Sequence, residues 1–182
     1  MKRAVIYFLK FKQPRSATLN DINYLKIRSW FLANNIRIKS FMVLYKILPL
    51  IVFISYFILC GWLFIKSDTR IYKVILIPLV IFILVSIMRK IIDRPRPYVV
   101  LNIDPLVKRD KNGESFPSRH VLSVCIIAIS CFYINPWIGA FMTVIAVLIA
   151  VIRVLAGVHF IKDVVVGALI SYVIGGLAFW LL

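Results

Sequence analysis

Acidic residues, histidines and cysteines are all scarce in this chain of 182 residues. It has 7 Asp and Glu residues against 23 Lys and Arg residues, and 2 histidines. The three cysteines, Cys60, Cys125 and Cys131, all lie within apolar runs, where a free cysteine behaves as a small buried hydrophobic residue. This distribution argues against a disulfide framework and against a cysteine-based metal site.

Apolar residues are abundant instead. Hydrophobic residues make up 62% of the chain and the mean hydropathy is +0.95, whereas soluble domains are roughly 45–50% apolar. The composition therefore predicts an integral membrane protein. A formal net charge of +16 would suggest a nucleic-acid partner in a soluble protein. No nucleic-acid-binding motif accompanies the charge, so the expected partners are the bilayer and its anionic lipids.

Long apolar stretches predict the path through the membrane, because a transmembrane helix needs about 20 mostly apolar residues. Three stretches supply about one such length each: residues 47–65, 71–88 and 164–182. Residues 121–152 carry no charge and are too long for one crossing, but Asn135 and Pro136 form a turn signal near their middle. The sequence thus predicts an all-α, polytopic transmembrane bundle of about five spans, two of them forming a hairpin.

The last predicted span carries small residues at regular spacing. Gly167, Ser171 and Gly175 recur every four residues. In membrane helices this pattern allows two helices to approach closely. We therefore expect this face to pack against another helix of the bundle.

The first 40 residues differ from the rest of the chain. Between residues 22 and 39, apolar side chains alternate with Lys26, Arg28, Arg37 and Lys39, which are too many charges for a span. We expect an interfacial amphipathic helix there. The predicted organisation is a basic amphipathic segment over residues 1–40, followed by a membrane-embedded domain over residues 41–182.

Ionisable groups at the ends of membrane helices are candidates for function, and the first cluster of them closes the second span. It contains the cations Arg89, Lys90, Arg94 and Arg96, and two prolines that end the helix. A planar guanidinium matches two phosphate oxygens at once, so this cluster suits an anionic head group. The alternative is a positive flank that only orients the span.

The second cluster, residues 115–120, directly precedes the third span. Ser118 is placed to cap the helix, and the free N–H groups at a helix N-terminus attract anions. Arg119 and His120 follow it in the sequence. The alternative is a capped helix start with an interfacial histidine and no further role.

The third cluster links the fourth and fifth spans and contains Arg153, His159 and Asp163. On one helix, residues four apart lie on the same face, so we expect His159 and Asp163 to stack. A carboxylate beside an imidazole fixes the tautomer of the ring and raises its basicity. The alternative is a purely structural hydrogen-bonded pair.

The predicted topology places all three clusters on one membrane face, together with both histidines. Combined, they resemble the three signature motifs of the type 2 phosphatidic acid phosphatase (PAP2) superfamily. The first motif, Lys-x6-Arg-Pro, aligns with residues 89–97, the second, Pro-Ser-Gly-His, with residues 117–120, and the third, Ser-Arg-x5-His-x3-Asp, with residues 152–163.

The resemblance implies a role for each matched residue. His159 would attack phosphorus to form a phosphohistidine, Asp163 would orient it, and His120 would protonate the leaving alkoxide. Arg96, Arg153 and the region of Ser118 would hold the phosphate oxygens. The resemblance implies no metal and no other cofactor.

Three positions depart from these motifs. Arg89 stands where the family has Lys, so either Arg89 or the adjacent Lys90 is the expected phosphate-binding cation. Arg119 replaces Gly and either adds a phosphate contact or restricts the substrate. Ile152 replaces Ser and removes one hydroxyl group. None of the three removes a proton-transfer group.

The expected function is hydrolysis of a lipid phosphomonoester or diphosphate, such as a polyprenyl diphosphate, a phosphatidylglycerophosphate or phosphatidic acid. One alternative is a phosphotransferase that passes the phosphate to a second lipid. Another is a membrane scaffold that gathers anionic lipids and catalyses nothing.

The distribution of positive charge predicts which side of the cell membrane carries the site. Five spans place the N-terminus on the same side as the three clusters. That side collects ten N-terminal cations, whereas the other keeps Lys66, Arg70 and Lys73. Because positive loops face the cytoplasm, we expect a cytoplasmic active site, although family members usually face outward.

Overall fold

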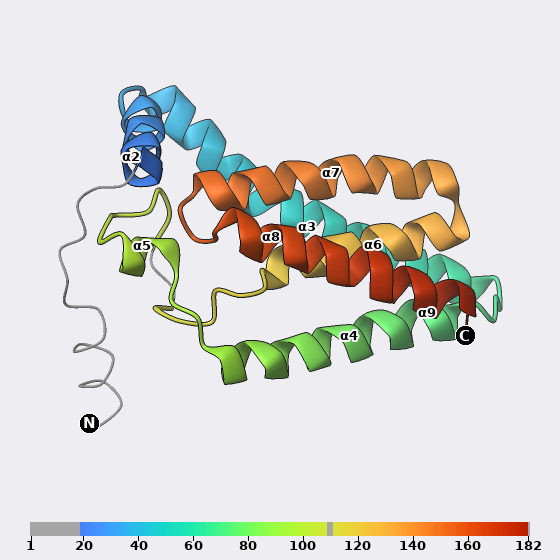
Figure 1. Ribbon diagram of the computed structural model, residues 1–182. Helices are drawn as coiled ribbons and strands as arrows, with labels where there is room; N and C mark the ends of the chain where they lie inside the picture. The colour runs from blue at the N-terminus through green and yellow to red at the C-terminus, as the bar shows by residue number, and fades with distance from the viewer. Residues whose placement is uncertain (1–18, 109–110, 182) are drawn as a thin grey trace.

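The computed structural model describes residues 19–108 and 111–181, and these contain helices and loops without a strand. In chain order the elements are α2 (Leu19–Leu32), α3 (Asn35–Ile65), α4 (Ile71–Ile92), α5 (Pro97–Val100), α6 (Arg119–Ile134), α7 (Pro136–Leu155), α8 (Ile161–Leu169), the π-helical segment η1 (Ile170–Gly175) and α9 (Gly176–Leu181). The long helices run alongside one another, and α2 and α5 gather at one end of the bundle (Figure 1).

The prediction of an all-α membrane bundle is confirmed. Four helical stretches in the described residues are long and apolar enough to cross a bilayer. These stretches are Asn35–Ile65 (α3), Ile71–Val100 (α4 and α5), Pro136–Leu155 (α7) and Ile161–Leu181 (α8, η1 and α9). The fifth apolar helix, α6, is shorter, with 16 residues. Leu182, the last residue of the expected fifth span, lies outside the described residues.

The predicted hairpin is formed by α6 and α7, which meet at Asn135. The Asn135 side chain accepts hydrogen bonds from the backbone N–H groups of Trp137 (2.9 Å) and Ile138 (3.2 Å). Pro136 occupies the first position of α7, where its missing N–H leaves no bond unmade. Capping and proline together therefore end one span and begin the next within a single residue.

Helix α6 lies in the middle of the bundle. It contacts α3, α4, α7, α8, η1 and α9, and most of its residues from Val121 to Cys131 are buried. One face of α6 joins an apolar cluster with α3 and α7, and the other joins a second cluster with α4 and α9. Packing on nearly every side fixes the position of its first turn, which carries part of the second polar cluster.

The small residues of the last span face α6, as expected. A Cβ atom on Gly167 would lie 2.9 Å from the Ser118 carbonyl oxygen, so only glycine allows this approach. One turn later, the Ser171 hydroxyl donates a hydrogen bond to the Leu122 carbonyl (2.8 Å). Gly175 lies against the Ile126 side chain. Ser171 and Gly175 belong to η1, a departure from α-helical geometry that the sequence did not predict.

The N-terminal segment differs from the prediction of one amphipathic helix over residues 22–39. Helix α2 ends at Leu32, and Asn34 caps the start of α3 by accepting a hydrogen bond from the Ile36 N–H (2.8 Å). Because α3 then continues without a break to Ile65, residues 35–46 extend the first span. The proposed boundary at residue 40 falls inside α3, and residues 1–18 lie outside the described residues.

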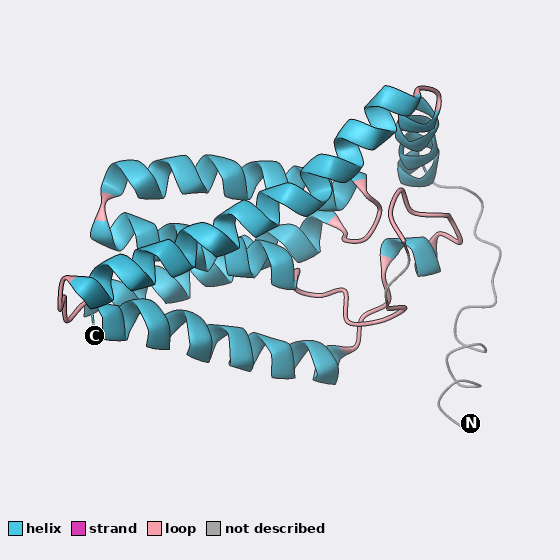
Figure 2. Ribbon diagram, turned by 180° about the vertical axis from the view of Figure 1, so that it is seen from behind, coloured by secondary structure: helices cyan, strands magenta, loops and turns pink. Residues whose placement is uncertain are grey.

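A third apolar cluster packs α2 and the outer part of α3 against the loops at one end of the bundle (Figure 2). The rings of Phe31 and Phe41 lie 4.8 Å apart between their centroids. The Tyr24 hydroxyl donates a hydrogen bond to the Ala156 carbonyl (3.3 Å). This cluster therefore holds the loop between α7 and α8, which carries His159.

Candidate active site

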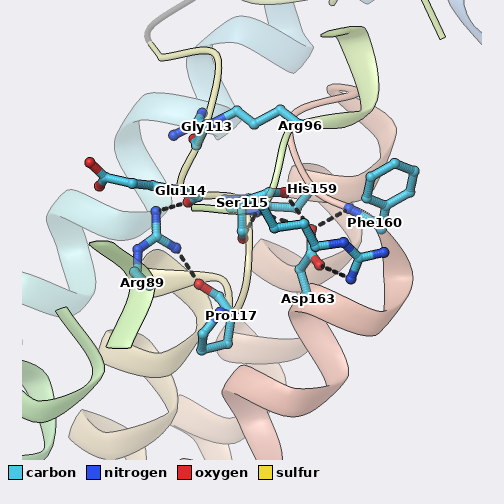
Figure 3. Close-up of polar contacts among 10 residues, drawn as sticks. Arg89, Arg96, Gly113, Glu114, Ser115, Pro117, His159, Phe160 and Asp163 are labelled. Carbon is cyan, nitrogen blue, oxygen red and sulfur yellow. Dashed lines mark hydrogen bonds and ion pairs between the residues drawn. The ribbon is translucent and has the colours of Figure 1, made fainter. Parts of the chain in front are cut away.

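The structure brings the three polar clusters together at this end of the bundle (Figure 3). The Ser115 N–H donates to the Arg94 carbonyl (2.8 Å), which ties the second cluster to the first. The Ser118 N–H donates to the Asp163 carbonyl (2.8 Å), which ties the second cluster to the third. Residues from three distant parts of the sequence thus form one site.

His159 is buried in the turn before α8, with 3% of its surface exposed. Its Nδ1 lies 3.0 Å from the backbone carbonyl oxygen of Ser115. Because a carbonyl can only accept, Nδ1 must carry the proton, and Nε2 keeps a free lone pair. Burial lowers the pKa of His159 below its ordinary value, while the Asp163 carboxylate acts in the opposite direction. The lowered pKa favours the uncharged form of the ring at neutral pH.

The side chains of His159 and Asp163 lie next to each other, as predicted, but the two residues do not share one helix. Helix α8 begins at Ile161 with Phe160 as its N-cap, so His159 precedes the helix. The Asp163 Oδ2 atom is 3.7 Å from His159 Nδ1, which is too long for a hydrogen bond. The carboxylate instead accepts the Phe160 N–H (2.9 Å), as acidic residues often do at a helix start.

Two further residues hold the Asp163 carboxylate, which is fully buried. The Ser115 hydroxyl donates to Oδ2 (2.5 Å), and Arg94 Nη1 donates to Oδ1 (3.2 Å). Ser115 therefore connects the pair, because its carbonyl binds His159 and its hydroxyl binds Asp163. Neither Ser115 nor Arg94 was predicted as a site residue. The only feature of the sequence that could have indicated them is that each lies within one of the three polar clusters.

Arg89 and Lys90 are separated by the structure into two environments. Arg89 is buried, with 3% of its surface exposed, and its guanidinium donates to the carbonyls of Glu114 and Pro117. Lys90 is exposed and does not line the site. Arg89 thus holds the loop of the second cluster in place while bringing its own charge to the site.

Arg96 and Arg153 are also buried, with 8% and 5% of their surfaces exposed. Arg96 Nε donates to the Gly113 carbonyl (3.2 Å), and Arg153 Nη1 donates to the Tyr45 hydroxyl. Both guanidinium groups are therefore held by neutral oxygen atoms. Their positive charge stays available to an anion, because these contacts do not neutralise it.

Ser118 occupies the N-cap position of α6, but its hydroxyl makes no capping bond, so the predicted side-chain cap is wrong. Its buried Oγ has no hydrogen-bond partner among the described residues. Its backbone groups are bonded: the Ser118 N–H donates to the Asp163 carbonyl, and the Ser118 carbonyl accepts from the Leu122 N–H. The next residue, Arg119, reaches over the ring of Phe82 (5.7 Å).

These side chains surround a small cavity of about 50 Å³. It is lined by the predicted residues Arg89, Arg96, Arg119, His120, Arg153 and His159. It is also lined by residues that the sequence did not predict, namely Tyr45, Lys108, Lys111, Glu114 and Val158. Of the other predicted residues, Lys90, Ser118 and Asp163 do not reach it.

The lining is strongly cationic. Glu114 is its one carboxylate among the described residues. Lys111 pairs with that carboxylate at 3.1 Å, and this hydrogen bond lowers the pKa of Glu114. Residues 19–108 and 111–181 contain no group of three or more His, Cys, Asp or Glu side chains placed to hold a metal ion. The cavity therefore suits an oxyanion that two histidines can reach.

A helical membrane bundle with a cationic cavity at one end, lined by two histidines, defines the class of protein. The chain belongs to the PAP2 superfamily, whose family model matches residues 70–182. The family resemblance inferred from the three motifs is thereby confirmed. The matched region contains all three clusters but excludes α2 and α3.

Two solved structures resemble this chain. Aquifex aeolicus LpxE is 28% identical with a TM-score of 0.66, and the match covers 84% of this chain and 91% of that chain. A transmembrane PAP2-type phosphatidylglycerolphosphate phosphatase from Bacillus subtilis is 23% identical with a TM-score of 0.60, and the match covers 100% of this chain and 94% of that chain. The second likeness concerns the fold alone. No curated protein sequence matches this chain significantly.

Proposed function

We propose that this protein is a phosphatase that removes a phosphate from a lipid head group through a phosphohistidine intermediate. The observation that carries the proposal is the environment of His159. Its Nδ1 is engaged by the Ser115 carbonyl, and the ring lines a cavity that also contains His120 and four arginines. A neutral nucleophile beside a cationic oxyanion site is what phosphoryl transfer requires.

In the first step, His159 Nε2 attacks phosphorus and forms an N–P bond. The bond between phosphorus and the ester oxygen breaks, and His120 gives its proton to the leaving oxygen. Arg89, Arg96 and Arg153 stabilise the charge on the other phosphate oxygens. Because Arg89 lines the cavity and Lys90 does not, Arg89 is the cation of the first motif in this proposal.

In the second step, His120 removes a proton from a water molecule, which attacks the phosphohistidine. The N–P bond breaks, inorganic phosphate leaves, and His159 regains its lone pair. Asp163 acts through Ser115 and the start of α8, which it anchors by accepting their hydrogen bonds. Arg119 adds a further contact to phosphate, and Ser118 contributes through the first turn of α6 rather than through its hydroxyl.

The proposed substrate keeps its tail in the bilayer while its phosphate enters the cavity. A polyprenyl diphosphate, a phosphatidylglycerophosphate or phosphatidic acid meets this requirement. Belonging to the PAP2 superfamily supports a lipid phosphate as the substrate.

The test is phosphate release by the purified protein from a panel of these lipids. We expect His159→Ala to abolish release, because it removes the nucleophile. Arg70→Ala, which removes a cation from the opposite end of the bundle, is the matched control and should retain full activity. Full activity of the His159→Ala protein would refute the mechanism, and transfer of phosphate to a second lipid without release would identify a phosphotransferase.

The same assay tests for a metal requirement. We expect activity to survive EDTA and to be inhibited by vanadate, which adopts the trigonal bipyramidal geometry of an attacked phosphate and so resembles the transition state. A strict need for an added divalent ion would contradict the proposed histidine chemistry.

We also propose that the site faces the cytoplasm, because α2 and the first turns of α3, which carry Lys26, Arg28, Arg37 and Lys39, lie at its end of the bundle. Single cysteines at Asn112 and Ser67 test this, since both positions are exposed and lie at opposite ends of the bundle. The background should lack Cys60, Cys125 and Cys131. An impermeant thiol reagent applied to intact cells should label position 67 alone, and labelling of position 112 alone would reverse the assignment.

A further inference from the structure

Tyr45 belongs to α3, outside the part of the chain that the family model matches, yet it lines the cavity. Arg153 Nη1 donates a hydrogen bond to the Tyr45 hydroxyl. The guanidinium carbon of Arg153 also lies 4.1 Å from the centre of the Tyr45 ring, within the range of a cation–π contact. One side chain from α3, which is distant from Arg153 in the sequence, therefore fixes both the plane and the rotation of this guanidinium.

The fixed orientation leaves part of Arg153 without a protein partner. Its side chain is 5% exposed, and the buried Nε atom has no hydrogen-bond partner among the described residues. A buried donor left unsatisfied is costly. The Nε–H of Arg153 is therefore a donor that the described residues leave unused and that the oxygen of a bound anion could accept.

The Tyr45 hydroxyl can also donate a hydrogen bond through its O–H. Arginine has no acceptor atom, so the Tyr45 oxygen accepts in this contact and its own O–H stays free. Among the described residues the structure provides no acceptor for that O–H. Because Tyr45 lines the cavity, a phosphate oxygen held by Arg153 is the acceptor within reach.

We propose that Tyr45 both positions Arg153 and donates its own hydrogen bond to the phosphate of the substrate. This inference rests on the proposed phosphatase function and extends it, because the oxyanion site then includes α3 as well as the matched motifs. Two neighbouring donors, one charged and one neutral, would bind the same phosphoryl group.

The first test measures the binding of inorganic phosphate to the full-length protein by ligand-dependent thermal stabilisation. Tyr45→Phe keeps the ring under Arg153 and removes only the hydroxyl, and we expect it to raise the Kd of phosphate about tenfold. Tyr56→Phe is the matched control, because Tyr56 lies on the same helix and its hydroxyl bonds to the Val74 carbonyl (2.9 Å) away from the cavity. Phosphate affinity equal to wild type in Tyr45→Phe would overturn the inference.

A second variant tests the link to Arg153. Arg153→Lys keeps a positive charge and the Tyr45 hydroxyl but loses the planar fork. We expect Tyr45→Phe to weaken phosphate binding much less in the Arg153→Lys background than in wild type. Equal losses in both backgrounds would refute the positioning role, because independent residues give additive effects.

Kinetics separate this inference from the proposed function. With a hydrolysed lipid phosphate, we expect Tyr45→Phe to raise KM more than it lowers kcat, whereas a general loss of structure would lower the amount of active protein and hence kcat alone. A fall in kcat with KM unchanged would count against phosphate contact. If no lipid phosphate is hydrolysed but Tyr45→Phe still weakens phosphate binding, the catalytic proposal fails and the anion site with Tyr45 stands.

Discussion

At the end of the bundle between α3 and α4, Arg70 pairs with Asp68 at 2.6 Å, and 41% of the Arg70 side chain is exposed. At the opposite end, Arg89, Arg96 and Arg153 are each at least nine-tenths buried. Their protein hydrogen bonds go to backbone carbonyls and to a tyrosine hydroxyl. Arg70 is therefore paired with a carboxylate, whereas these three arginines are bonded to neutral oxygen atoms.

The difference shows how a chain with few carboxylates can build an anion site in a membrane. A buried cation must make hydrogen bonds, or its desolvation is too costly. Neutral acceptors supply those bonds without cancelling the charge, which an incoming phosphate can then balance. At the cavity end, the Asp163 carboxylate accepts hydrogen bonds from Arg94, Ser115 and Phe160. Arg89, Arg96 and Arg153 therefore remain free to bind the ligand.

The sharpest test of this comparison is to remove one arginine from each end. We expect Arg153→Ala to lower kcat/KM for a lipid phosphate by about 10²–10³-fold, the range found when one transition-state donor is lost. Arg70→Ala should leave kcat/KM unchanged, because the Arg70 side chain pairs with Asp68 and does not line the cavity. Similar losses in both variants would show that the two ends do not differ in the way proposed.

A smaller effect is expected on stability when the acidic partners are compared. Ser115→Ala removes a hydrogen bond of 2.5 Å from the buried Asp163, which should lower the free energy of unfolding by about 1–3 kcal/mol. Asp68→Asn breaks a partly exposed pair and should change the thermal midpoint in detergent less than Ser115→Ala does. A Ser115→Ala midpoint equal to wild type would mean that Asp163 does not depend on this bond.

The smallest expected effect concerns pH. His159 must be unprotonated to attack, and burial lowers its pKa below the ordinary value of 6.5, so the acid limb of kcat/KM should lie below pH 6.5. Asp163→Asn removes the carboxylate that raises this pKa, which should shift the limb further toward acid. Asp68→Asn at the far end should not move it. A shift toward higher pH in Asp163→Asn would contradict the assignment of the limb to His159.

Sequence reasoning succeeded where the signal was local. The apolar runs predicted the spans, and Asn135 with Pro136 predicted the hairpin turn, because capping and a missing N–H act within one helical turn. The spacing of Gly167, Ser171 and Gly175 predicted a tightly packed face for the same reason. The topology of five spans was then enough to place both histidines at one end.

Contacts between distant residues could not be predicted in this way. Tyr45 and Arg153 are 108 positions apart, and no pattern around Tyr45 distinguishes it from other aromatic residues of α3. His159 and Asp163 lie side by side as expected, but not on one helix, because α8 begins between them. Ser118 is a residue type that commonly caps helices, but its hydroxyl makes no capping bond at the start of α6.

The short length of α6 has a consequence for how the chain enters the membrane during synthesis. At 1.5 Å per residue, its 16 residues extend about 24 Å, roughly 6 Å less than the hydrocarbon core. A helix this short, with Arg119 and His120 in its first turn, is poorly suited to cross the lipid alone. The Asn135 turn joins it directly to α7, so we expect the two helices to enter the membrane as a pair. The end of α6 that carries His120 would then reach its final depth together with α7.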